Sequence, residues 1–226
     1  MSKKVIIAGG GIGGLTAALC LHQAGFEVKV FESVKEIKPL GVGINTLPHC
    51  VRVLTNLGLQ EKLAQNAIET SDLVYFNRFG QQFWSEPRGR FAGYKWPQFS
   101  IHRGVLQMIL WEEALNQLGE PAILTNCHLH HFEQNNAAVT AFFADRDNGT
   151  IARVETADVL VGADGINSVV RQQLNPNEGP PVYSENVLYR GTTRMQPFLN
   201  GQSMAMIGSL KQKMVVYPIQ PEPDAD

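Results

Sequence analysis

Residues 5–32 read VIIAGGGIGGLTAALCLHQAGFEVKVFE. Two short apolar runs in this stretch, Val5–Ala8 and Val28–Phe31, predict β-strands. The apolar stretch Leu15–Gln23 between them predicts a helix that ends at Ala24-Gly25. A strand, a helix and a second strand of this kind form a unit whose two strands pair in parallel. The stretch therefore predicts an α/β fold with a Rossmann-like parallel sheet.

The glycines of this stretch have the spacing of a nucleotide-binding turn. Gly9, Gly11 and Gly14 fit the pattern G-x-G-x-x-G, in which the first allows a tight turn, the second lets a pyrophosphate approach the backbone and the third packs helix against strand. The free N–H groups at the helix start attract an anion. Glu32 follows Gly14 at a spacing close to that of an acid that binds a ribose. The stretch predicts a dinucleotide site; the alternative is a glycine-rich turn without a ligand.

The composition limits the partners. With 226 residues the chain can form one large domain, or one domain and part of another. A formal net charge of −2 with scattered Lys and Arg gives no electrostatic signature of nucleic acid or of an anionic membrane, and no apolar run approaches the ~20 residues of a membrane span. Cys20, Cys50 and Cys127 are odd in number and far apart, which predicts free thiols in a cytoplasmic protein.

Two stretches in the first half are candidates for ligand contact. Residues 37–44 are an apolar loop with Gly41 and Gly43, which suits the approach of a flat ligand or forms a plain connector. Arg103 opens a predicted helix that reaches Leu118, so it is a cation placed against the helix dipole. Its partner is either a cofactor pyrophosphate or a surface carboxylate.

Residues 122–156 predict a three-stranded β-meander, because three short β-type runs are separated by Asn135-Asn136 and Asp147-Asn148-Gly149. The region also holds a set of residues that can ligate metals: Cys127, His128, His130 and His131. Strand alternation separates His128 and His130 from the other two, and no Cys-x-x-Cys or acidic pair accompanies them. No metal site is expected.

Residues 159–161 predict a buried strand that ends in Gly162, followed by Asp164-Gly165 and a short helix capped by Asn167 or Ser168. Ligands of open α/β sheets lie at the carboxyl ends of strands, where Asp164 stands. The alternative is an Asp-Gly turn without a function.

The remaining segments predict β-structure of a different kind. Residues 73–85 predict a hairpin that turns at Gly80, either part of a substrate-facing sheet or a simple edge hairpin. Beyond a Pro-rich linker, three alternating segments predict strands: 186–195, 204–207 and 214–219. Residues 221–226 are polar and are expected to be disordered.

These motifs occur in the order found in single-component FAD-dependent aromatic hydroxylases of the p-hydroxybenzoate hydroxylase type. The chain resembles that family over nearly its whole length, and particularly its phenazine-modifying monooxygenases, in four segments: residues 37–45, 84–89, 98–110 and 159–171. The resemblance implies FAD as cofactor, NAD(P)H as co-substrate and O2 as oxidant, with hydroxylation of an aromatic or heteroaromatic small molecule. Because the flavin carries the chemistry, no catalytic side chain is assigned.

The resemblance also implies the residues that bind FAD. They are Gly9, Gly11, Ile12, Gly13 and Gly14 at the pyrophosphate, Glu32 at the adenosine ribose, Val42 and Gly43 along the isoalloxazine, Arg103 at the phosphate or ribityl chain, Leu129 near the adenine and Asp164 on the pyrophosphate side, where it also aids nicotinamide binding.

The implied domains are an FAD-binding domain, residues 1–72 and 98–179, and the start of a substrate-binding sheet, residues 73–97 and 180–226. The family's third FAD motif is a Gly-Asp pair, and no Gly-Asp dipeptide occurs in this sequence. The chain is therefore expected to be the N-terminal half of such a monooxygenase. The alternatives are a truncated member that binds FAD or a protein without turnover, and an NAD-dependent dehydrogenase, which Arg103 and Asp164-Gly165 disfavour.

Overall fold

The computed structural model describes residues 2–221, so most of the expected disordered tail, residues 222–226, lies outside the described part. The chain divides into two compact units. Unit 1 consists of Met1–Lys38 and Leu110–Leu188, and unit 2 consists of Pro39–Ile109 and Tyr189–Asp226. These bounds differ from the expected division into FAD-binding and substrate-binding parts, which stays a prediction.

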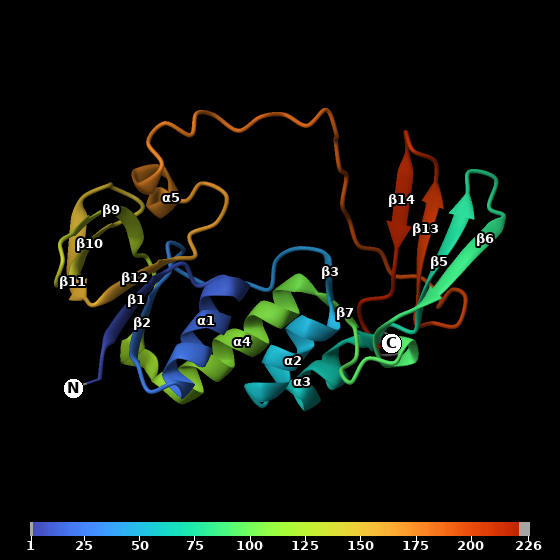
Figure 1. Ribbon diagram of the computed structural model, residues 1–226, viewed down its shortest axis with the longest axis horizontal. Coiled ribbons are helices and arrows are strands. Elements are labelled where there is room, and N and C mark those ends of the chain that lie inside the picture. Colours follow the sequence, from blue (N-terminus) through green and yellow to red (C-terminus); the bar gives the residue numbers. More distant parts are fainter. Residues whose placement is uncertain (1, 222–226) are drawn as a thin grey trace. The chain divides into compact units, whose positions relative to one another are not determined.

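Unit 1 contains the predicted parallel sheet, with strand order β12-β1-β2-β8. Its elements are β1 (Lys4–Ala8), α1 (Ile12–Gln23), β2 (Glu27–Phe31), the 3-10 helix η2 (Glu120–Ala122), β8 (Ile123–Leu124) and β12 (Val159–Gly162). Helix α1 packs against β2 (Figure 1). It does so through Leu15, Ala18 and Leu19, which are fully buried at the spacing of one helix face. The predicted strand, helix and strand at the start of the chain are confirmed.

The predicted meander is confirmed as an antiparallel sheet with strand order β11-β10-β9. Its strands are β9 (His128–Gln134), β10 (Val139–Ala144) and β11 (Ile151–Ala157). The meander shares a buried core with the parallel sheet, in which the rings of Phe31 and Phe143 stack with centroids 4.1 Å apart. The last residue of β2, directly before Glu32, is thereby fixed against the meander.

The prediction that the histidines alternate strictly between the two faces of β9 is wrong. The pairing of β9 with β10 shifts register between Phe142 and Phe143, which leaves His130 as an extra residue in a β-bulge. The bulge brings the Nδ1 atoms of His130 and His131 to 2.9 Å from each other, and the His131 ring stacks on Phe142. Among residues 2–221, no three His, Cys, Asp or Glu side chains gather closely enough to hold a metal ion.

Strand β12 is less buried than expected. It forms the edge of the parallel sheet, and no strand of the described residues pairs with its outer side. The side chain of Val159 is 45% exposed. The chain then turns through Gly165, which has φ of +81°, into the short helix α5 (Val169–Leu174).

Unit 2 contains two further sheets and two short helices. The first sheet has the order β14-β13-β5-β6 and the second, antiparallel sheet has the order β3-β7-β4. The elements are β3 (Gly43–Thr46), α2 (Pro48–Asn56), α3 (Gln60–Asn66), β4 (Ile68–Glu69), β5 (Asp72–Asn77), β6 (Gln82–Pro87), the 3-10 helix η1 (Gly89–Ala92), β7 (Phe99–His102), β13 (Ser203–Gly208) and β14 (Lys213–Val216). Helix α4 (Arg103–Leu118) contributes residues to both units.

The predicted hairpin of unit 2 is confirmed as β5 and β6, which turn through Gly80 with φ of +78°. The Asn77 side chain accepts the N–H groups of Phe79 and Gln81 and closes the turn. The expected strand at residues 186–195 is wrong, because these residues form no regular secondary structure and leave Tyr189 92% exposed. Alternating polarity produces a strand only where a partner strand is available, and none of the described strands pairs with them. No helix among residues 2–221 is long and apolar enough to cross a bilayer.

Candidate functional site

The glycine turn between β1 and α1 is closed on one side and open on the other. A β-carbon at Gly9 would lie 2.2 Å from the Ala163 oxygen, and one at Gly14 would lie 1.9 Å from the Gly9 oxygen. At Gly11 and Gly13, by contrast, a β-carbon would meet no atom within 4 Å. The first and third glycines of the motif therefore permit packing, and the second faces the open side.

The open side of this turn has the properties of an anion site. Helix α1 starts at Ile12 after Gly11, which cannot cap it with a side chain, and no acidic residue lies in the first turn. The first N–H groups of a helix have no acceptor within the helix, and the dipole adds positive potential there. The N–H groups at the start of α1 are thus suited to bind an anion, and the first turn carries no competing carboxylate.

Glu32 lies beside the same turn, as its spacing in the sequence predicts. One carboxylate oxygen accepts the N–H of Gly10 at 2.7 Å, and the other accepts the N–H of Val34 at 2.9 Å and the Ser33 hydroxyl at 3.0 Å. The carboxylate is half-buried, so these bonds hold it in one orientation next to the glycines.

Asp164 also reaches the glycine turn, but its carboxylate serves helix α5. Its oxygens accept the Ser168 hydroxyl at 2.6 Å and the N–H of Val169 at 2.6 Å. The residue before it contacts the turn, since Ala163 donates its N–H to Ala8 at 2.8 Å and its carbonyl lies against Gly9. Asp164 therefore fixes the loop that supports the turn.

Ser168 is the N-cap of α5, one of the two caps expected from the sequence. Its hydroxyl oxygen accepts the N–H of Arg171 at 3.0 Å. We expect Ser168→Ala to lower the free energy of unfolding by about 1 kcal/mol, because the N–H of Arg171 in the first turn of α5 loses its acceptor. Thermal unfolding of the two proteins measures the effect, and Ser184→Ala, in an exposed segment without helix, is the control. Equal midpoints for all three proteins would contradict the capping role.

Leu129 is placed differently from the other predicted residues of unit 1. It is 3% exposed and belongs to the core that contains Phe31 and Phe143. Its side chain is enclosed by protein and is therefore not available to a ligand such as an adenine.

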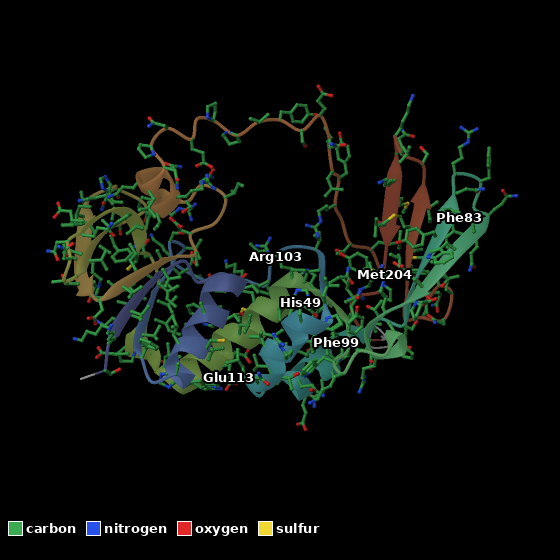
Figure 2. The ribbon with its side chains drawn as sticks, in the orientation of Figure 1. His49, Phe83, Phe99, Arg103, Glu113 and Met204 are labelled. Atoms are coloured by element: carbon green, nitrogen blue, oxygen red, sulfur yellow. The ribbon has the colours of Figure 1, made fainter. Side chains whose placement is uncertain are left out.

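The predicted residues of unit 2 gather at the start of α4. Arg103 donates its N–H to the carbonyl of Val42 at 2.9 Å, and a β-carbon at Gly41, where φ is +126°, would lie 3.5 Å from the Arg103 β-carbon. Figure 2 shows Arg103 at the first turn of α4. The Arg103 side chain is exposed and forms no ion pair with any carboxylate of the described residues. Within these residues, the structure therefore contains no surface salt bridge at Arg103.

Gly104 supports this group of residues and was not predicted from the sequence. A β-carbon at Gly104 would lie 2.2 Å from the carbonyl carbon of Pro39, so the start of α4 packs directly on the backbone of the loop. Glycine lowers helix stability, and its presence at the second position of a long apolar helix is the signal that indicates such a close approach.

Two hollows of unit 1 lie away from the glycine turn and Glu32. One, of about 210 Å³, is lined by Phe132, Val139, Leu160 and Val170 among others, and a second, of about 310 Å³, by Phe26, Val28, Leu118 and Pro121 among others. Neither includes a residue of the glycine turn or Glu32. Within unit 1, the candidate site is an open surface formed by backbone N–H groups and one acid.

Comparison with known proteins agrees with this reading of the turn. The sequence model of the family described as "FAD binding domain" matches residues 2–213. Phenazine 1,6-dicarboxylic acid hydroxylase of Lysobacter antibioticus is 40% identical over 216 residues, which cover 95% of this chain and 53% of that protein. 3-Hydroxybenzoate 6-hydroxylase of Polaromonas naphthalenivorans is 35% identical over 175 residues, covering 75% of this chain and 41% of that protein.

The solved structures show the same fold. That of Klebsiella pneumoniae HpxO complexed with FAD and uric acid matches 96% of this chain and 53% of its own with a TM-score of 0.69 at 22% identity. The chain spans about half the length of the curated relatives named above. The resemblance to FAD-dependent aromatic hydroxylases is confirmed by these relatives, and the chain belongs to the FAD-binding domain family.

Proposed function

We propose that this chain is the FAD-binding part of a monooxygenase that uses NAD(P)H and O2 to hydroxylate an aromatic or heteroaromatic small molecule. The observation that carries the proposal is the open, uncapped N-terminus of α1 with the Glu32 carboxylate fixed beside it, in a chain of the FAD-binding family. Relatives named as hydroxylases of phenazine 1,6-dicarboxylic acid, 3-hydroxybenzoate and urate support the substrate class. A cytoplasmic location is part of the proposal and is supported by three free cysteines.

The residues of unit 1 are suited to the ADP part of FAD. In this proposal Gly11, Ile12, Gly13 and Gly14 donate N–H groups to the pyrophosphate, and Glu32 accepts hydroxyl groups of the ribose. Gly9 and Asp164 act indirectly: Gly9 allows the turn to rest on Ala163, and Asp164 ties that loop to α5. Leu129 contributes its backbone near the adenine.

The residues of unit 2 are suited to the flavin part. Val42 and Gly43 are proposed to line the isoalloxazine, and Arg103 to bind a phosphate or the ribityl chain. Bound FAD supplies hydride acceptance and the activation of O2, and the protein supplies binding, orientation and electrostatics. The proposed domain division, with 1–72 and 98–179 for FAD and 73–97 and 180–226 for the substrate, follows from these roles.

The direct test is a titration of the purified chain with FAD, followed by flavin absorbance and fluorescence. Saturable binding supports the proposal, and the absence of binding overturns it. Oxidation of NADH or NADPH is then measured with the bound flavin in the presence of aromatic acids and heteroaromatic compounds. Binding without oxidation, in this chain and in a longer protein that contains it, would favour the alternative of an FAD-binding member without turnover.

Arg103→Ala is expected to weaken FAD binding about 10-fold or more, because a charge-assisted hydrogen bond contributes about 1.5–3 kcal/mol. The exposed Arg78, in the turn of the β5–β6 hairpin, is the matched control, and Arg78→Ala should bind FAD like the unchanged chain. Equal affinities of the two variants would contradict the proposed role of Arg103.

A further inference from the structure

The carbonyl groups of the loop at residues 41–43 are each bound by a different donor. The ring of His102 contacts the Gly41 oxygen through Nε2 at 3.1 Å, and the Arg103 N–H bonds to the Val42 oxygen at 2.9 Å. Both donors lie at the junction of β7 and α4. The third carbonyl, that of Gly43, accepts Nη2 of Arg190 at 2.7 Å. Arg190 is 147 residues further along the chain, so it is the distant member of the three.

The same glycine is contacted by two more side chains from the end of unit 2. A β-carbon at Gly43 would lie 2.6 Å from Cε2 of Tyr217 and 2.8 Å from Cγ2 of Ile219. Arg190 and Tyr217 thus contact one peptide from two different segments. A side chain at position 43 would require Tyr217 and Ile219 to move.

The part of the chain that the structure describes does not neutralise the charge of Arg190. No carboxylate among residues 2–221 lies within ion-pair distance of its guanidinium. The bond from the rigid guanidinium restrains the Gly43 carbonyl, in addition to the pairing of Gly43 with His102 between β3 and β7. The surrounding segment, residues 186–195, has no secondary structure that could place Arg190 there for another reason.

We infer that Arg190 is a positioning residue, which fixes the Gly43 peptide and with it the surface that loop 41–43 offers to the isoalloxazine. The inference rests on the proposed function, since it is that proposal which places the flavin against this loop. Arg190 acts through the backbone of Gly43, and its removal leaves the two local bonds, to Gly41 and Val42, unchanged. The loop should then remain folded but be less well fixed at one peptide.

The experiment compares Arg190→Ala and Arg190→Lys with Arg194→Ala, a matched change four residues further in the same exposed segment. Hydrogen exchange of the peptide covering residues 39–44 is measured in the FAD-free chain. The affinity for FAD and the visible flavin spectrum are measured afterwards, and circular dichroism checks that all variants are folded. Lysine retains a positive charge and N–H donors but lacks the planar guanidinium, so it should restore part of each effect.

Arg190→Ala is expected to increase exchange in residues 39–44 about tenfold, to weaken FAD binding about three- to tenfold and to change the flavin spectrum. Arg194→Ala should match the unchanged chain. Unchanged exchange in Arg190→Ala overturns the inference, and faster exchange with the same FAD affinity and spectrum reduces Arg190 to a structural residue. If the unchanged chain does not bind FAD, the proposed function fails and the flavin role of Arg190 fails with it. The exchange data then separately show whether Arg190 holds the loop.

Discussion

Replacing Gly14 by alanine is expected to abolish FAD binding, with a loss of affinity of about 100-fold or more. The added β-carbon would lie 1.9 Å from the Gly9 oxygen and 3.2 Å from the β-carbon of Ala163, and both neighbours are part of the packed support of the turn. Helix α1 or the turn must therefore move, and such overpacking destabilises a protein by about 1–3 kcal/mol. Because the N–H groups of the turn are the proposed pyrophosphate donors, their displacement removes the site.

Gly13→Ala is the matched control for the effect of this change on packing and stability. It adds the same methyl group one residue earlier, where no protein atom lies within 4 Å, and alanine favours a helix over glycine by up to about 1 kcal/mol. Thermal unfolding of both variants separates packing from helix propensity. FAD titration compares Gly14→Ala with the unchanged chain, because Gly13 belongs to the proposed pyrophosphate site. A Gly14→Ala protein that keeps the unfolding midpoint and the FAD affinity of the unchanged chain would show that the turn tolerates the methyl group, and it would contradict the geometry described for Gly9 and Gly14.

The second large effect is expected for Glu32→Ala, with FAD affinity lowered about 10- to 100-fold. The carboxylate has two tasks: it is the proposed acceptor of the ribose hydroxyl groups, and it binds the N–H groups of Gly10 and Val34. The variant loses both, and each hydrogen bond to a charged group contributes about 1.5–3 kcal/mol. Its unfolding midpoint should fall together with its affinity.

Glu36→Ala is the control, because Glu36 forms a solvent-exposed ion pair with Lys38, and exposed pairs of this kind contribute at most about 1 kcal/mol. Glu32→Gln distinguishes the two tasks of Glu32: its amide oxygen can still accept one N–H group, so stability should recover more than FAD affinity. Equal recovery of both quantities would show that Glu32 acts on the turn alone and has no contact with the ribose.

The parts of the fold that the sequence predicts are those with local causes. The strand–helix–strand start follows from periodicity and glycine spacing, and the closeness of Glu32 to the turn follows from its position at the end of β2. The meander and the β5–β6 hairpin follow from runs separated by Asn-rich and Gly-containing turns. Each element is indicated by residues within it or in its flanking turns, and Glu32 lies near Gly10 because both follow neighbouring parallel strands.

The features that the sequence did not predict depend on contacts between distant residues. The bulge at His130 is a property of the pairing of β9 with β10, and the exposure of β12 depends on which strands lie beside it. In the candidate site, the Asp164 carboxylate is bound to the start of α5, and the side chain of Leu129 is in the core. Spacing in the sequence identifies such residues without showing which of their atoms remain available.

The open edge of β12 affects how the chain behaves in concentrated solution. Strand β12 contains Val159, Leu160 and Val161. It has no lysine, proline or other residue that discourages edge-to-edge pairing. Unpaired backbone groups of such a strand are a template for the strand of another molecule, so crowding should favour aggregates that grow from this side of the sheet. Dilution, and a charge introduced at Val159, are therefore the natural means of keeping the isolated chain monodisperse.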